Sequence, residues 1–303
     1  MFHSVARATV TPRGGRYDLR FVLGRRTTRV LRTGAAPLIA EWAPDGASVA
    51  IELFAAFAPK SVSADDVEVA MKTAVGIAGL DDDPGDFDQV AKGHPLLARL
   101  QRRFGGTRLG RTATVFESFA TAIIQQLVTY QEASASIRRL IYRYGQRIGD
   151  FTAFPTAAEV HAIPPHDLRA IGIGIRRATT LREAAARGAA LERLRGHSPE
   201  DAMVRAQSLR GIGVWTAAKV AVEALGYADA ILLRDAVLPF AVTKALTGVA
   251  AGDDALVECL EPFRPHRARV TRLIQLASVY DEVPGLTRKP LPRVDPHRRY
   301  PFR

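Results

Sequence analysis

Residues 209–216 read Leu-Arg-Gly-Ile-Gly-Val-Trp-Thr and lie between two stretches in which apolar residues recur at helical spacing. Two glycines so close together predict that one helix ends, the chain turns tightly and the next helix starts at once. Gly211 and Gly213 suit such a turn because glycine alone takes positive φ without strain. The next helix would expose its first backbone N–H groups, which form an anion site. The pattern predicts a phosphate-binding hairpin, although an ordinary glycine cap between helices would look the same.

A second glycine pair has almost the same surroundings. Residues 170–175 read Ala-Ile-Gly-Ile-Gly-Ile, with Gly172 and Gly174 in the corresponding places. No isolated carboxylate follows this pair in an apolar setting. Glu192 comes 18 residues after Gly174 (192 − 174), beside two arginines on what the sequence predicts to be a solvated helix face. We therefore expect a plain helix–helix turn here, with a second phosphate contact as the alternative.

A single carboxylate follows the first pair. Asp235 lies 24 residues after Gly211 (235 − 211), between the apolar runs 230–233 and 236–238. Its position predicts the N-cap of a helix, and Pro239 is tolerated in the first turn of that helix. A cap needs no catalytic role, so this residue gains meaning only together with the hairpin.

The charge of the chain favours an anionic partner. The net charge is +11 and the pI is about 10.3, which points to nucleic acid before an acidic membrane. The arginine-rich segment 99–111 and the basic, proline-rich residues 285–303 predict nonspecific phosphate affinity, or else solvated surface. One cysteine and seven scattered histidines exclude a disulfide framework, a four-cysteine iron–sulfur cluster and a zinc site of ordinary spacing. No signal peptide or membrane-spanning run is present, so we expect a cytoplasmic protein.

The N-terminal third predicts a small sheet with a helix packed on it. Residues 8–11, 17–22 and 48–53 have strand-like alternation. Ser63 and Asp66 form a capping box that starts a helix.

Helical periodicity begins after Thr114, and Thr129 with Glu132 predicts a break that leaves residues 126–128 on a turn. Further helices are expected over 157–161, 165–171, 176–187, 199–209, 214–225, 236–246, 254–260 and 266–280. We divide the chain into a mixed α/β domain (1–105), a helical core (106–284) and a basic tail (285–303).

With these motifs in place, the chain resembles the helix-hairpin-helix DNA glycosylase superfamily, and within it the 3-methyladenine DNA glycosylase II family. The resemblance runs from about residue 96 to residue 280. It is strongest at residues 209–217 with Arg234 and Asp235, and it includes residues 115–129. It implies a mostly α fold, in which two helical lobes with a cleft between them follow a small N-terminal α/β sheet domain.

The resemblance also implies roles for individual residues. Asp235 would be the catalytic carboxylate, because an anion stabilises the positive charge that develops on the sugar. Leu127 would fill the gap left by the flipped nucleotide, unless it is simply a core leucine. The base pocket would contain Trp215, Lys219 and Gln126. The DNA-binding residues would be Leu127, Arg210, Gly211, Ile212, Gly213 and Thr216.

Trp215 stands where strand-cutting relatives carry a lysine, so we expect a monofunctional enzyme that leaves an abasic site. The implied substrate is double-stranded DNA with damaged bases, chiefly alkylated purines that would stack on Trp215; alternatively, this side chain packs the hairpin. The implied protein is a monomer without membrane contact and without a cofactor, apart from a monovalent cation at the hairpin when DNA is bound.

Non-aromatic residues occupy positions where the family often has aromatic ones, namely Lys219, Ala236 and Gln275. A different lesion, such as a deaminated base, is therefore an alternative substrate. A DNA-binding protein without catalysis and a bifunctional glycosylase/lyase that uses Lys219 are the alternative functions.

Overall fold

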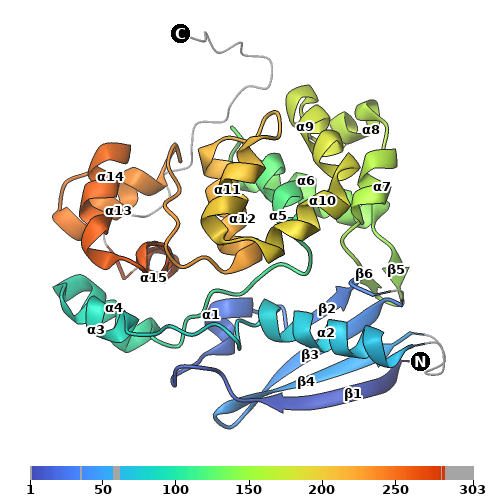
Figure 1. Cartoon of the computed structure of the whole chain (residues 1–303), viewed down its shortest axis with the longest axis horizontal. Helices are drawn as coiled ribbons and strands as arrows, with labels where there is room; N and C mark the ends of the chain where they lie inside the picture. Colours follow the sequence, from blue (N-terminus) through green and yellow to red (C-terminus); the bar gives the residue numbers. More distant parts are fainter. Residues whose placement is uncertain (1, 35, 57–61, 281, 284–303) are drawn as a thin grey trace.

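The computed structural model describes residues 2–34, 36–56, 62–280 and 282–283, and it has an N-terminal sheet beneath two groups of helices (Figure 1). The mostly α fold with a small N-terminal sheet domain is therefore confirmed. No helix within the described ranges is both long and apolar enough to span a bilayer. The predicted basic tail, 285–303, lies outside the described residues.

The sheet is antiparallel, with the strand order β1-β4-β3-β2. Its strands are β1 (His3–Val10), β2 (Thr28–Leu31), β3 (Leu38–Asp45) and β4 (Ser48–Ala55). Helix α2 (Ala64–Ile77) covers one face, where Trp42 Nε1 donates to the carbonyl oxygen of Ala74 at 3.1 Å. The capping box of Ser63 and Asp66 starts this helix as predicted.

The strand predicted over residues 17–22 is wrong. This segment forms the short helix α1 (Leu19–Leu23), because Asp18 caps it by accepting a hydrogen bond from Arg20 N at 2.9 Å. A single helical turn is too short to show helical periodicity, so its apolar residues alternated as they would in a strand.

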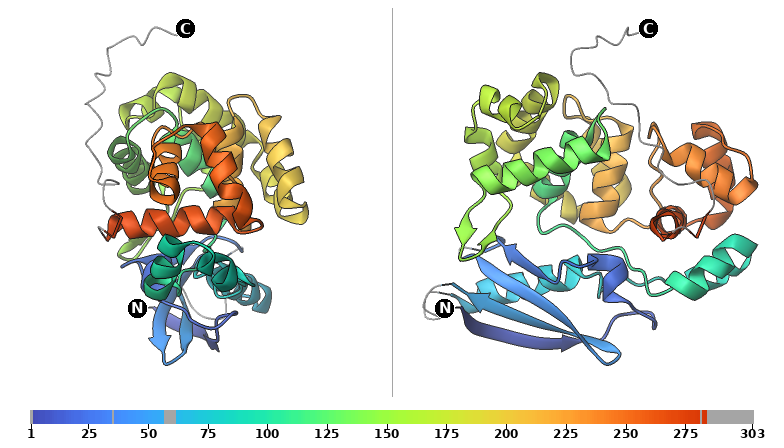
Figure 2. Two further views of the ribbon diagram at one scale, coloured as in Figure 1. Left: turned by 90° about the vertical axis from the view of Figure 1, so that its left-hand side faces the viewer. Right: turned by 180° about the vertical axis from the view of Figure 1, so that it is seen from behind.

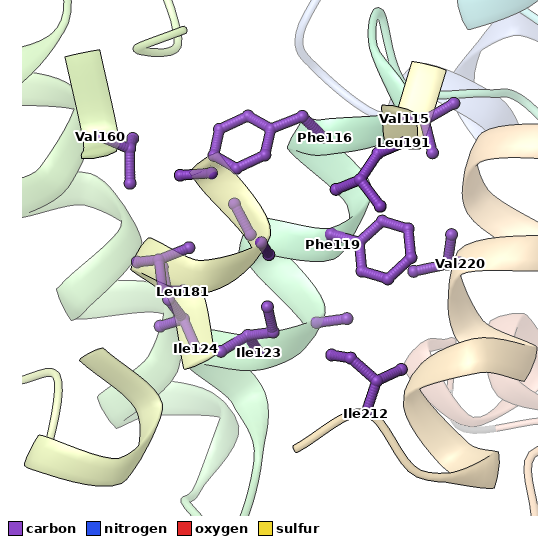
Figure 3. Packing of buried hydrophobic residues seen from close by; sticks show 14 of the residues in the cluster. Val115, Phe116, Phe119, Ile123, Ile124, Val160, Leu181, Leu191, Ile212 and Val220 are labelled. Atoms are coloured by element: carbon purple, nitrogen blue, oxygen red, sulfur yellow. The ribbon is translucent and has the colours of Figure 1, made fainter. Parts of the chain in front are cut away.

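The first helical lobe is built around α5 (Val115–Gln125), which contributes Phe116, Phe119 and Ile123 to a buried cluster (Figure 3). Leu181 and Val220 reach the same cluster from the helices on either side. The other elements of this lobe are α6 (Tyr130–Tyr144), β5 (Arg147–Ile148), β6 (Phe151–Thr152), α7 (Ala157–Ala162), α8 (Pro165–Ala170), α9 (Ile175–Ala186), α10 (Gly188–Glu192), the 3₁₀ turn η2 (Arg193–Gly196), α11 (Pro199–Gln207) and α12 (Val214–Leu225).

The break predicted between α5 and α6 is confirmed, including the capping box of Thr129 and Glu132. The solvated face predicted for Glu192 is wrong. Its carboxylate accepts hydrogen bonds from Val115 N at 3.0 Å and Phe116 N at 2.9 Å, so it caps the start of α5.

The second helical lobe joins two distant parts of the chain. It contains α3 (Phe87–Lys92), α4 (Pro95–Phe104), α13 (Leu238–Thr247), α14 (Asp253–Leu260), the 3₁₀ turn η3 (Glu261–Phe263) and α15 (Arg267–Val279). Phe104 shares a buried cluster with Leu260 and Leu273, and Figure 2 shows α4 beside α15. The division between residues 105 and 106 stays a prediction, while the packing groups α3 and α4 with the C-terminal helices.

The arginine-rich segment is partly internal. Arg108 is 2% exposed and donates to the carbonyl oxygens of Arg13, Gly14 and Arg16. Arg111 forms an ion pair with Asp81. These two arginines link the sheet domain to the helices, so they do not contribute to the phosphate-binding surface predicted for residues 99–111.

Candidate DNA-binding hairpin and active site

The turn between α11 and α12 has the predicted hairpin geometry, with one correction. Gly211 has a φ of +83°, and a Cβ there would lie 2.4 Å from Thr180 Oγ1. Gly213 has a φ of −96°, which any residue can adopt, and an added Cβ would meet nothing within 4 Å. The predicted positive φ is therefore wrong for Gly213. Its missing side chain instead leaves the first N–H groups of α12 open to close approach.

The side chains of the hairpin mostly face inward. Ile212 is 5% exposed and belongs to the core of the first lobe. Thr216 is 2% exposed and accepts a hydrogen bond from Gln126 Nε2 at 2.9 Å. The same Gln126 nitrogen donates to the carbonyl oxygen of Gly211 at 3.0 Å. Gln126 thus ties the α5–α6 turn to the hairpin, and its place in the base pocket stays a prediction. Arg210 is exposed on the turn itself.

Leu127 projects from the α5–α6 turn into solvent. Its side chain is 94% exposed, so the alternative of a core leucine is wrong. Its φ of +55° lies in the left-handed region that non-glycine residues seldom occupy. An exposed leucine on a strained backbone gains nothing from folding, and strain of this kind is typical of a functional position.

Asp235 lies two residues before Val237, the N-cap of α13, so its predicted N-cap position is wrong, and its carboxylate contacts both α13 and the hairpin helix. Oδ1 accepts hydrogen bonds from Val237 N and Leu238 N, both at 2.9 Å, at the start of α13. Oδ2 accepts one from Trp215 Nε1 at 2.8 Å. Three donors therefore fix the carboxylate beside the half-buried Trp215 ring, which itself packs against the first lobe's core.

The residue before this carboxylate is strained. Arg234 has a φ of +62°, and within the described ranges it shares a positive φ with only one other non-glycine residue, Leu127. Both oxygens of Asp253, at the start of α14, accept from Arg234 N, at 3.1 and 2.9 Å. Asp253 was not predicted. The sequence predicted only that a helix starts near this residue. Its contact with Arg234 could not be predicted, because it forms only when the fold brings α14 to this loop.

A cavity of about 880 Å³, with walls from the sheet and both lobes, lies beyond Lys219, and neither Trp215 nor Asp235 lines it. Lys219, Glu223 and Gln125 line it on one side, and Arg272 and Gln275 line it on the other. Gln125 therefore lines this cavity, whereas Gln126, the next residue, does not. Burial lowers the pKa of Arg272, and the nearby Glu223 opposes that shift.

Lys219 lies between this cavity and Trp215. Its Nζ is 5.8 Å from the centroid of the indole ring and donates to Glu223 Oε1. In the described part of the chain, no cluster of three His, Cys, Asp or Glu side chains could hold a metal ion.

Known glycosylases resemble this chain in sequence and fold. DNA-3-methyladenine glycosylase 2 of Escherichia coli (strain K12) is 34% identical over 157 residues, which cover 48% of this chain and 53% of the relative. DNA-3-methyladenine glycosylase of Bacillus subtilis (strain 168) is 26% identical over 164 residues, which cover 52% and 54%. The solved 3-methyladenine DNA glycosylase from Archaeoglobus fulgidus matches with a TM-score of 0.76 and 20% identity, over 92% of this chain and 100% of that one. No family model matches.

The chain is therefore similar in sequence to DNA-3-methyladenine glycosylases and has the fold of solved DNA glycosylases. The match spans about half the length of these curated relatives. Within this glycosylase fold, the structure brings the hairpin, Leu127, Trp215 and Asp235 together, although they come from three separate stretches of sequence. The carbonyl oxygens of Leu209 and Gly211 in the hairpin accept hydrogen bonds from Ile212 N and Gln126 Nε2. A monovalent cation at the hairpin stays a prediction.

Proposed function

We propose that this chain is a monofunctional DNA N-glycosylase, which flips a damaged base out of duplex DNA and hydrolyses its N-glycosidic bond to leave an abasic site. The observation that carries this proposal is Asp235. Its carboxylate is fixed by Trp215 Nε1 at 2.8 Å and by two backbone amides at the start of α13. The curated relatives are named for 3-methyladenine, an alkylated purine, which supports a damaged purine as the substrate class.

The residues around Asp235 suit hydrolysis. The carboxylate can stabilise the cationic sugar and orient the attacking water. The open N-terminus of α12 beside Gly213 would bind a DNA phosphate, with Arg210 adding charge. Leu127 would occupy the space left in the duplex by the flipped nucleotide.

Trp215 supports a monofunctional reaction because an indole cannot form a Schiff base. The nearest amine, Lys219, is engaged by Glu223. Borohydride treatment during turnover should therefore trap no covalent complex with DNA. A trapped complex that disappears in Lys219→Ala would show lyase chemistry instead.

The test is to incubate the full chain with duplex oligonucleotides that each contain one lesion, and then to cleave abasic sites with alkali. Asp235→Asn should slow base release at least about a hundredfold while the affinity for lesion DNA is kept. The substituted amide can point only one oxygen at its donors, so a modest loss of thermal stability is expected as well. Asp254→Asn, which changes an exposed carboxylate on α14, is the matched control and should leave base release unchanged.

Full activity in Asp235→Asn would contradict the catalytic role. DNA binding without any base release by the unaltered chain would instead support a DNA-binding protein without catalysis. Cytoplasmic localisation and a monomeric state stay predictions.

A further inference from the structure

One face of the Trp215 ring is occupied by a positive charge of the protein itself. Trp215, Lys219 and Glu223 follow one another at intervals of four along α12 and therefore share one face of that helix. Lys219 Nζ lies 5.8 Å from the ring centroid and donates to Glu223. The lysine side chain is only 14% exposed, so its ammonium is held in place and poorly screened by solvent.

The cavity beyond Lys219 has the same sign of charge. Its lining includes seven Lys and Arg side chains and two Glu side chains. Each glutamate pairs with one of these cations, in the ion pairs Lys219–Glu223 and Arg29–Glu117. Of the five other arginines, Arg111 pairs with Asp81 behind the wall, and Arg108 donates to backbone carbonyl oxygens. Among the described residues, Arg26, Arg138 and Arg272 form no ion pair with a carboxylate. A base entering from the Trp215 side therefore meets an excess of positive charge.

This arrangement disfavours a cationic base and favours a neutral one with an acceptor. A cation stacked on Trp215 would compete with Lys219 for the ring and would be repelled by the ammonium. An ammonium has three N–H groups and Glu223 accepts from it, so Lys219 retains donors for a carbonyl oxygen. Gln125 and Gln275, which also line the cavity, add neutral hydrogen-bonding groups rather than aromatic rings.

Resting on the glycosylase activity proposed above, we propose that Lys219 is a specificity-determining residue, through which this site selects neutral purines with a ring carbonyl oxygen over cationic alkylated purines.

Lys219 also suits the chemistry that a neutral purine requires. When the C1′–N9 bond breaks, its electron pair stays on the departing base, and the oxygen of a water molecule forms the new bond to C1′. The proton lost by that water ends on the base. Negative charge develops on the base and its carbonyl oxygen during this step, and a hydrogen bond from Lys219 would stabilise it. A cationic purine leaves as a neutral molecule and needs no such donor.

Two lesion bases distinguish the effect of the positive charge from the effect of the carbonyl oxygen. Hypoxanthine is neutral and has a ring carbonyl, whereas 7-methylguanine has a carbonyl and a positive charge. We would measure single-turnover release of each from the same duplex sequence by the full chain and by Lys219→Met. The rate ratio of hypoxanthine to 7-methylguanine should fall at least about tenfold in Lys219→Met, the size expected for loss of one charged hydrogen bond. Lys219→Arg should keep most of the ratio, because it keeps the charge.

Lys244→Met, at an exposed lysine on α13, is the charge-matched control and should not change the ratio. Thermal unfolding of each variant checks that the comparison is between folded proteins. An unchanged ratio in folded Lys219→Met, with release still dependent on Asp235, would overturn the specificity role while the glycosylase activity stands. No release of any base by the unaltered chain would overturn the glycosylase activity itself.

Discussion

The two glycine turns have similar backbones and different surroundings. The first glycine of each has a positive φ, +95° at Gly172 and +83° at Gly211. The second glycine of each, Gly174 or Gly213, directly precedes a helix. Beside Gly174, Arg177 donates to the carbonyl oxygens of Gly172 and Ile124, so a guanidinium covers that turn. An added Cβ at Gly213 would meet nothing.

The carboxylates that follow the two turns differ in the same way. Glu192 satisfies the first amides of α5 and is fully used in holding the first lobe together. Asp235 accepts from two backbone amides at the start of α13 with one oxygen and from Trp215 on the hairpin helix with the other. A glycine turn is therefore a common way to join helices, and it serves a site only where its helix N-terminus stays open and a carboxylate faces its helix.

The largest effect that separates the turns should come from their first glycines. Gly211→Ala and Gly172→Ala each place a Cβ at positive φ, 2.4 Å from Thr180 Oγ1 and 2.8 Å from Ser136 Oγ. Each should lower the free energy of unfolding by about 2 kcal/mol. Only Gly211→Ala should also weaken DNA binding, measured by fluorescence anisotropy under conditions where both variants are folded. Equal loss of affinity in both would mean that both turns contact DNA.

A smaller and more selective effect is expected at the second glycines. Gly213→Ala fits its backbone and its space, so stability should not change, but the methyl group obstructs the approach to the α12 amides. We expect roughly tenfold weaker binding to duplex DNA, the cost of one poorly made charged hydrogen bond. Gly174→Ala, where the nearest atom would be Arg177 Nη2 at 3.7 Å, is the matched control. If it weakened binding as much, the covering arginine would not block that turn.

The smallest effect is expected at the α5–α6 turn, which carries Leu127. Gln126 on this turn donates to the carbonyl oxygen of Gly211, and Arg177 beside the second glycine turn donates to that of Ile124 near the end of α5. Leu127→Gly removes the strain of a φ of +55° and should raise the free energy of unfolding by about 1 kcal/mol. Leu127→Ala keeps the strain and should leave stability unchanged. Both should bind a duplex with an abasic analogue less tightly than the unaltered chain. A clear loss of stability in Leu127→Ala would show that the leucine supports the fold instead.

Much of this architecture could be predicted because its signals are local. The capping boxes at Ser63 and Thr129, the break at residues 126–128 and the span of α12 all depend on residues within a few positions of one another. The family resemblance, carried by the hairpin and Asp235, predicted the fold. Where the local signal was short, as at α1, the prediction was wrong.

The sequence by itself determined the helices, the glycine hairpin and the presence of a carboxylate after it. Only the tertiary structure decided what each side chain does: Gln126 ties two turns together, Glu192 caps a distant helix, and Asp253 holds the strained Arg234. It also decided that Lys219 would lie over Trp215 and line a cavity together with several arginines. Contacts of this kind join residues far apart in the chain, and their partners are chosen by packing, which leaves no periodic signal in the sequence.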